Sequence, residues 1–234
     1  MQNVELFNGW RRVILEIDDA GSGSPVGGII IGGRKGDKYS YRIIPVNFFQ
    51  DMKLSNDAVR KEVLRVVKQL LLELRFDPKE DAIRICRGEI FSMTKQWFDE
   101  QGYQWMPVKI ESHLQDYVEG VFDLHLIQLG IPRMLVKRMF DYRDYVILPL
   151  KWVVLKRADR EHVVKKRFKI WRQEWACAEI TFARETANKR IFCNNCGGVI
   201  RKATPIYLAK ITTPKRVLRA YLHPECKKAL DLNI

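Results

Sequence analysis

Apolar runs in the first part of the chain predict three antiparallel strands. Residues 13–17 are apolar apart from one glutamate and rich in β-branched side chains, which is typical of a buried strand. Two more apolar runs follow at 26–33 and 39–46, and the polar segment 34–37 between them has the composition of a hairpin turn. We therefore expect a three-stranded meander at the start of the chain.

Helical periodicity then alternates with short apolar runs. Between residues 59 and 74 the apolar residues fall on one helical face; Ser55 or Asn56 can cap this helix, and the Phe-Asp-Pro segment 76–78 stops it. We then expect a strand at 82–86, a short helix capped by Ser92, a strand at 103–110 whose Pro107 indicates a sheet edge or a bulge, and helices at 112–130 and from Pro132 to about Tyr142.

The remaining third of the chain is harder to interpret from its pattern. The apolar, β-rich run 145–155 predicts a closing strand or a connection between domains. Residues 159–189 show an apolar stripe at helical spacing and predict one long helix, with Trp171 and Trp175 expected in the core. Two strand-like runs, 205–211 and 216–221, precede a final helix.

Composition adds size and compartment to this picture. The 234 residues, 47% of them hydrophobic, suffice for one medium domain and a small one: we expect domains at 1–150 and 191–234, joined by a basic helical connector at 151–190. Five cysteines, an odd number, argue against a disulfide scaffold, and neither a long apolar run nor a secretion signal is evident. A cytoplasmic protein with no membrane partner is therefore expected.

The charge is unevenly divided along the chain. Residues 1–150 carry 21 basic and 21 acidic side chains, whereas residues 151–234 carry 20 basic and 7 acidic ones, so the whole net charge of +13 lies in the last 84 residues. A local excess of this kind favours a partner that carries phosphates, which indicates DNA or RNA; an anionic membrane surface is the other physical possibility.

Two adjacent acids end the first buried run. Asp18 and Asp19 follow Ile17 and lead into a glycine-rich turn. A buried strand seldom ends in two carboxylates for packing reasons, because each is costly to bury unless it is hydrogen-bonded or binds a cation. The simpler alternative is that Asp-Ala-Gly here forms only a turn.

The segment Ile17-Asp18-Asp19-Ala20-Gly21-Ser22-Gly23 resembles the opening of ribonuclease H-like domains, the superfamily of type 2 ribonucleases H, RuvC-type resolvases and retroviral integrases. The expected order of three strands, helix, strand, helix, strand, helix also resembles that of the family. The resemblance implies an α/β fold in which a mixed five-stranded sheet is flanked by helices. Ser22 stands where type 2 ribonucleases H carry arginine, so recognition of an RNA–DNA junction by this turn does not carry over.

The resemblance also implies a catalytic carboxylate cluster that holds Mg²⁺ or Mn²⁺ and cleaves phosphodiesters. The matching acids are Asp18, with Asp19 as a second acid of the first strand; Glu89 after the fourth strand; and Asp116 and Glu119 on the later helix, where Asp123 lies on the same face. Glu111, just before that helix, is a rival ligand. Actin-like ATPases and sugar kinases also open with a strand, an aspartate and glycines, but they need two such domains.

A second candidate metal site lies near the end of the chain. Cys193 and Cys196 form a Cys-x-x-Cys pair before glycines, and His223 and Cys226 form a His-x-x-Cys pair at the start of the last helix. Thiolate and imidazole ligands suit tetrahedral Zn²⁺. The arrangement resembles a treble-clef zinc finger, which implies a structural ion, while two unrelated pairs are the alternative. Cys86 and Cys177 lie in apolar runs and are expected to be inert core thiols.

These observations together predict a metal-dependent nuclease whose basic zinc-finger tail holds DNA or RNA. One alternative is a nucleic-acid-binding protein that has the same fold without catalysis. Another is a zinc-stabilised adaptor that binds a protein.

Overall fold

The computed structural model describes residues 4–7 and 10–231, which form two compact units. The first unit takes the chain up to Ser22, Gly28–Pro45 and Lys53–Phe122; the second comprises Gly23–Gly27, Val46–Met52 and the chain from Asp123 onward. The expected boundaries at residues 150 and 190 stay a prediction. No helix of the described residues has the length and apolar content needed to cross a membrane.

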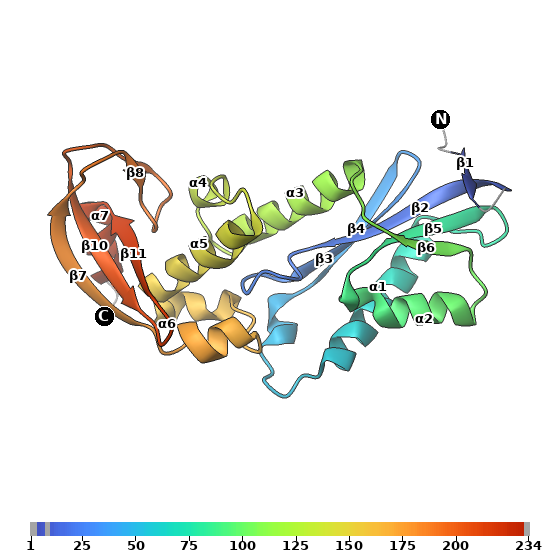
Figure 1. The fold of residues 1–234 in the computed structure, drawn as a ribbon, viewed down its shortest axis with the longest axis horizontal. Coiled ribbons are helices and arrows are strands. Elements are labelled where there is room, and N and C mark those ends of the chain that lie inside the picture. Colours follow the sequence, from blue (N-terminus) through green and yellow to red (C-terminus); the bar gives the residue numbers. More distant parts are fainter. Residues whose placement is uncertain (1–3, 8–9, 232–234) are drawn as a thin grey trace. The chain divides into compact units, whose positions relative to one another are not determined.

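A mixed sheet forms the centre of the first unit (Figure 1). Its strands run in the order β4-β3-β2-β5-β6, and β1 pairs with the first half of β2. β3 is antiparallel to both of its neighbours, whereas β2, β5 and β6 are parallel. The bounds are β1 Val4–Phe7, β2 Trp10–Ala20, β3 Ile29–Lys35, β4 Lys38–Ile44, β5 Asp81–Cys86 and β6 Trp105–Val108.

Helices cover both faces of this sheet. Adjacent residues of a strand point to opposite faces. A Cβ added to Gly32 would meet Val118 and Leu114 of α3 (His113–Gln128), whereas one added to Gly33 would meet Leu74, which follows α1 (Asn56–Glu73). α2 (Ser92–Glu100) packs beside α1. The first unit therefore has three layers, with α1 and α3 on opposite sides of the sheet.

The predicted elements of this unit are confirmed in kind and order. The Ser55 hydroxyl accepts the Ala58 N–H at 3.0 Å and caps α1, as expected. β6, which contains Pro107, is an edge strand. The second strand was expected from residue 26 but begins at Ile29, because Val26 instead forms a bridge with Val164. The coarse prediction of a mixed five-stranded α/β sheet flanked by helices is therefore correct.

The second unit contains short helices and small sheets. β10 (Pro205–Thr212) lies between β11 (Val217–Leu222) and β7 (Glu179–Thr186), antiparallel to both, and a separate hairpin joins β8 to β9. The other bounds are α4 Arg133–Val136, α5 Tyr142–Leu155, α6 Arg157–Arg160, β8 Ile191–Phe192, β9 Val199–Ile200 and α7 Pro224–Asp231, with 3-10 helices at Val46–Phe49, Glu89–Phe91 and Glu161–Val163 and a π-helical turn at Trp171–Trp175.

The prediction of a strand at 145–155 is wrong, because this segment is part of helix α5. Asp141 caps the helix by accepting the Asp144 N–H at 2.9 Å. Pro149 lies inside α5 and has no N–H to give to the Tyr145 carbonyl, four residues earlier. The Ser24 hydroxyl lies 3.2 Å from that carbonyl oxygen and 3.0 Å from the Val26 carbonyl oxygen, so it can donate to either.

The prediction of one long helix over 159–189 is also wrong. Residues 163–165 are held by the turn after β2: the Gly27 N–H donates to the Val163 carbonyl at 2.9 Å, and the Lys165 N–H donates to the Pro25 carbonyl at 2.8 Å. The segment from Glu179 forms β7 by pairing with β10. Trp171 and Trp175 are buried, as predicted.

Candidate metal centres

The first candidate centre lies where β2 and β5 end. These parallel strands pair Ile17 with Ile85, so the next residues along each strand, Asp18 and Cys86, come side by side. One carboxylate oxygen each of Asp18 and Asp19 and the Cys86 sulfur all lie within 4.8 Å of one another. Asp18 lies opposite Gly32 in the sheet and so points to the face that α3 covers.

Burial dominates the chemistry of Asp18. The residue is 6% exposed, and the pKa of its carboxyl is raised to about 6, mainly by loss of solvent. Hydrogen bonds from the Asp19 backbone and the Cys86 thiol oppose this shift, while the negative charges of Asp19 and Glu119 add to it. A carboxylate that is costly to ionise gains most from a bound cation. A cation bound at this carboxylate would therefore favour its ionised form.

The Cys86 thiol was expected to be an inert core residue, but it is half-buried beside the two aspartates. Burial raises the pKa of this thiol to about 11. It is therefore protonated at neutral pH, and it donates its hydrogen to Asp18. Sequence reasoning missed this neighbour because a cysteine at the end of an apolar strand looks like core.

The other predicted acids divide into two groups. Glu119 of α3 lies close enough to Asp18 to raise its pKa, and its side chain accepts a hydrogen bond from Gln115 at 2.9 Å. Glu89 instead forms an ion pair with Arg60 at 2.8 Å, with 79% of its side chain exposed, and Asp116 is exposed on the first turn of α3. The geometry thus brings Asp18 and Asp19 together, whereas Glu119 and Glu89 lie outside the group of ligand atoms within 4.8 Å of one another.

The rival Glu111 also points elsewhere. It pairs with Lys109, and this hydrogen bond lowers the pKa of its carboxyl. Asp123, on the same helical face as Asp116, accepts a hydrogen bond from the Tyr145 hydroxyl at 2.7 Å.

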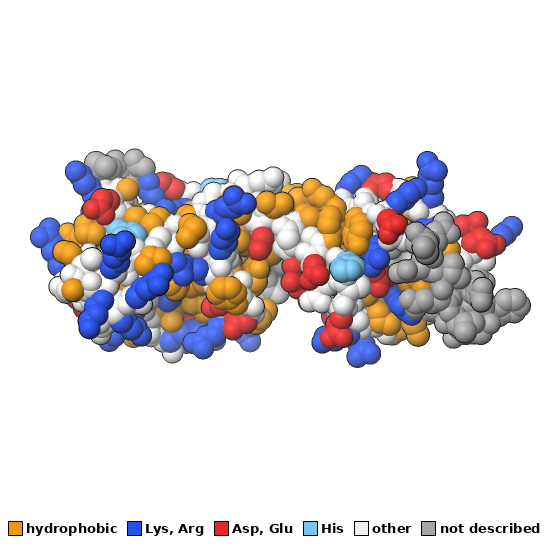
Figure 2. Space-filling model, turned by 90° about the horizontal axis from the view of Figure 1, so that it is seen from above, with side chains coloured by type: hydrophobic (Ala, Val, Ile, Leu, Met, Phe, Trp, Pro, Cys, Tyr) orange, Lys and Arg blue, Asp and Glu red, His pale blue; other side chains and the backbone are white. Residues whose placement is uncertain are grey.

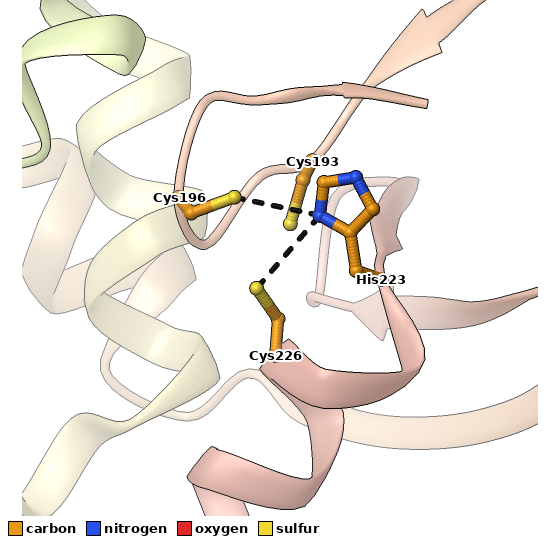
Figure 3. Close-up of side chains that lie close together, drawn as sticks. All are labelled: Cys193, Cys196, His223 and Cys226. Carbon is orange, nitrogen blue, oxygen red and sulfur yellow. Dashed lines mark hydrogen bonds between the residues drawn. The ribbon is translucent and has the colours of Figure 1, made fainter. Parts of the chain in front are cut away.

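The second candidate centre is the Cys/His set that the spacing predicts, and its four side chains point toward one another (Figure 3). Cys193 and Cys196 lie on the turn between β8 and β9, His223 directly precedes α7, and Cys226 lies on its first turn. His223 Nδ1 lies 3.4 Å from the Cys196 sulfur and 3.9 Å from the Cys226 sulfur. Tetrahedral zinc bonds of ~2.3 Å to sulfur and ~2.0 Å to nitrogen would separate these atoms by ~3.5 Å.

The surroundings of His223 also fit a metal ligand. Its Nε2–H donates to the Val199 carbonyl at 3.2 Å, which leaves the Nδ1 lone pair directed at the sulfurs. Metal-bound histidines commonly donate their other ring N–H in this way. The Gly198 N–H donates to the Cys196 sulfur at 3.4 Å. These four residues therefore form a site that could hold a metal such as zinc.

Local structure sets the cysteine turn in place. Gly197 has a φ of +73°, which glycine adopts without strain, and its N–H donates to the Cys193 carbonyl at 2.8 Å. Asn194, between the two cysteines and 2% exposed, exchanges two 2.8 Å hydrogen bonds with the Tyr221 backbone of β11. This pairing brings the turn beside His223, two residues further along.

A comparison with protein-family models finds no match, and a comparison with curated protein sequences finds none either.

Proposed function

We propose that this chain is a divalent-metal-dependent nuclease whose first unit has a ribonuclease H-like fold. The observation that carries the proposal is the meeting of Asp18 and Asp19 at the end of the central strand, with Glu119 of α3 nearby. Strand order, strand directions and the helix on each face support the fold assignment.

The proposed chemistry uses Mg²⁺ or Mn²⁺ held by these carboxylates. Hard oxygen ligands favour both ions. Bound there, the ions would activate water and stabilise the leaving oxygen of a phosphodiester. Asp18 and Asp19 hold the ion, and Glu119 completes the cluster from α3. A catalytic role for Glu89 and Asp116 remains a prediction, and the variants Glu89→Gln and Asp116→Asn test it.

The second unit would supply the nucleic-acid contacts. We propose that Cys193, Cys196, His223 and Cys226 bind one structural Zn²⁺ as a treble-clef finger, because four protein ligands leave no open position for a substrate. In Figure 2, the surface over the C-terminal elements, at the left, carries Lys and Arg side chains interleaved with hydrophobic ones. Such a surface suits a phosphate backbone.

The test is cleavage of labelled DNA and RNA by the full chain with Mg²⁺ or Mn²⁺. Asp18→Asn should lower the rate by about 100-fold or more, because it removes the buried ligand charge. Glu111→Gln is the matched control, since this exposed acid pairs with Lys109 away from the cluster. Cleavage that survives Asp18→Asn undiminished would overturn the assignment.

A non-catalytic nucleic-acid-binding protein is the second candidate. It is favoured by the protonated Cys86 thiol, which lies beside Asp18 at the end of β5, and by the engagement of Glu89 with Arg60. Salt-sensitive binding of DNA or RNA without cleavage, in the presence of either metal, would support this candidate.

A further inference from the structure

Two aromatic side chains, one in the connection between α4 and α5 and one at the first residue of α5, are largely exposed to solvent. Phe140 is 84% exposed and Tyr142 is 71% exposed, among the highest values for large hydrophobic residues that the structure describes. Single exposed apolar residues are ordinary on protein surfaces. Two aromatic rings within three residues, on one loop, call for a specific explanation. We refer to residues 137–143, which comprise this connection and the first two residues of α5, as the aromatic loop.

The aromatic loop is ordered although its rings are not buried. The Asp144 carboxylate accepts the Phe140 N–H at 3.3 Å, and the Asp141 carboxylate accepts the Asp144 N–H at 2.9 Å. Met139, the preceding residue, is 5% exposed and anchors the loop in the core. The backbone at Phe140 is thus fixed on both sides, while its ring extends outward. With the backbone fixed, only the two side-chain torsions of Phe140 need to be ordered when a partner stacks on its ring.

Tyr142 is held by a different contact. A Cβ added to Gly23 would lie 2.7 Å from the Tyr142 ring, so the ring lies against this glycine, and the tyrosine hydroxyl is 3.5 Å from the Gly23 carbonyl oxygen. Glycine at this position lets the ring approach the backbone closely.

Basic side chains surround the aromatic loop. Arg133 and Lys137 lie one helical turn apart on and just after α4, Arg143 follows Tyr142, and all three are exposed. Further along α5, Lys151 donates to the Arg219 carbonyl at 2.7 Å. Asp141 of the loop and Asp144, directly after it, both accept hydrogen bonds from backbone N–H groups.

We propose that the aromatic loop is a base-stacking site for unpaired nucleotides, with Phe140 as the stacking ring and Arg133, Lys137 and Arg143 as phosphate contacts. Sites for single-stranded nucleic acid combine aromatic platforms with a positive surface in this way. An anionic lipid surface fits less well, because only Met134 adds further exposed apolar area on α4. The inference rests on the nucleic-acid partner of the proposed function and adds which residues contact the bases.

The experiment measures binding of the zinc-loaded full chain to a labelled single-stranded oligonucleotide and to its duplex, without Mg²⁺ or Mn²⁺. Phe140→Ala should weaken single-strand binding by about 5- to 150-fold, the range expected for loss of one base–aromatic stack, and should change duplex binding much less. Phe140→Trp should retain affinity, and its fluorescence should fall when the oligonucleotide binds. The matched control is Leu72→Ala, which removes a side chain of α1 that is 79% exposed.

Salt dependence separates stacking from charge. Phe140→Ala should leave the slope of log affinity against log salt unchanged, whereas Lys137→Ala should reduce it by about 1. Unchanged single-strand affinity in Phe140→Ala overturns the proposal. The proposal is also overturned if Phe140→Ala keeps its nucleic-acid binding but loses binding to phosphatidylserine vesicles or loses self-association. If the wild type binds nucleic acid but does not cut it, the nuclease proposal alone is overturned. If the wild type and Phe140→Ala cut a single-stranded substrate equally well, the stacking site alone is overturned.

Discussion

At the scale of single residues, Asp18 is a buried carboxyl beside a second acid, an arrangement that lowers stability when the group is ionised but suits a metal ligand. The residue is 6% exposed, and its carboxyl lies beside Asp19 and Cys86. Loss of solvent is the main reason why the pKa of Asp18 is about 6 and not near 3.8. Compared with the unfolded chain, the folded chain therefore shifts the equilibrium of Asp18 toward its protonated form.

This shift predicts how stability depends on pH in the absence of Mg²⁺ and Mn²⁺. Because folding raises the pKa of Asp18, its protonation contributes to the free energy of unfolding. This contribution is fully present below about pH 4 and is lost as the pH rises through about 6. Asp18→Asn should therefore raise the free energy of unfolding at pH 8 by about 1–3 kcal/mol and change it little at pH 4. Urea unfolding of both proteins at each pH measures the difference.

Added Mn²⁺ should make the wild type more stable than Asp18→Asn at pH 8, since only the wild type is stabilised by binding the ion. A stability difference that stays constant from pH 4 to pH 8 would contradict the assignment of the shift to Asp18. The experiment needs buffers without strong chelators, which would also remove an ion from the Cys/His site.

Sequence alone locates the two aspartates but not their surroundings. Asp18 and Asp19 stand out because acids are unusual after an apolar strand. The neighbouring thiol of Cys86 could not be identified, since a cysteine in an apolar run is typical of core. The ion pair of Glu89 with Arg60 joins residues 29 positions apart and leaves no local signal.

At the scale of elements, the contact between β3 and α3 depends on a glycine. A Cβ at Gly32 would lie 2.2 Å from a methyl carbon of Val118. Gly32→Ala should therefore destabilise the protein by about 1–3 kcal/mol, the usual cost of overpacking, as measured by urea unfolding.

A matched glycine on α3 should respond in the opposite direction. A Cβ at Gly120 meets no atom within 4 Å, so Gly120→Ala should stabilise α3 by about 0.5–1 kcal/mol. Val118→Ala should relieve part of the cost of Gly32→Ala. Equal effects at the two glycines would contradict the packing of α3 on β3.

The Cys/His site connects two secondary-structure elements, because its ligands come from the β8–β9 turn and from the start of α7. Cys226→Ser should abolish the binding of one Zn²⁺ per chain, and the segment from Cys193 to Cys226 should become sensitive to limited proteolysis, since metal binding and folding are coupled in such sites. Metal content and proteolysis measure both effects. Cys177→Ser, at an exposed cysteine outside the site, is the control and should change neither.

The pattern of the chain predicted the first unit better than the second. The strands and helices from β2 to α3 follow from local periodicity, and the Ser55 cap was predicted correctly. Strand β1 was not predicted, and Ser92 is not the cap of α2. Helix α5 contains a proline, and β7 is a strand only because it pairs with β10. The strand β7 depends on a partner further along the chain, which no local pattern indicates, whereas the Asp141 cap was a local signal for α5 that the apolar run 145–155 outweighed.

At the scale of the whole molecule, the charge is the dominant property. The excess of 13 positive charges lies entirely in residues 151–234. If this part binds a phosphate backbone, log affinity should fall linearly with log salt, with a slope of about −0.9 for each phosphate contacted on duplex DNA.

Single substitutions locate the contacts that contribute to this slope. Lys202→Ala, at an exposed residue beyond β9, should reduce the slope by about 1, as measured by duplex binding over a range of salt concentrations. Lys61→Ala, at an exposed position of α1, is the control and should leave the slope unchanged. An identical decrease for both would indicate a diffuse effect of net charge.

The bond from Ser24 to the Tyr145 carbonyl has a consequence for the tolerance of this protein to substitution. Because Pro149 has no N–H, the Tyr145 carbonyl lacks the helical donor that it would have in an uninterrupted helix. The Ser24 hydroxyl can therefore donate to this carbonyl. Exchange of Pro149 for alanine would offer that carbonyl a helical donor and release the hydroxyl. The effects of Ser24→Ala and Pro149→Ala should therefore be non-additive in a double-mutant cycle, so that each position limits which residues the other can accept.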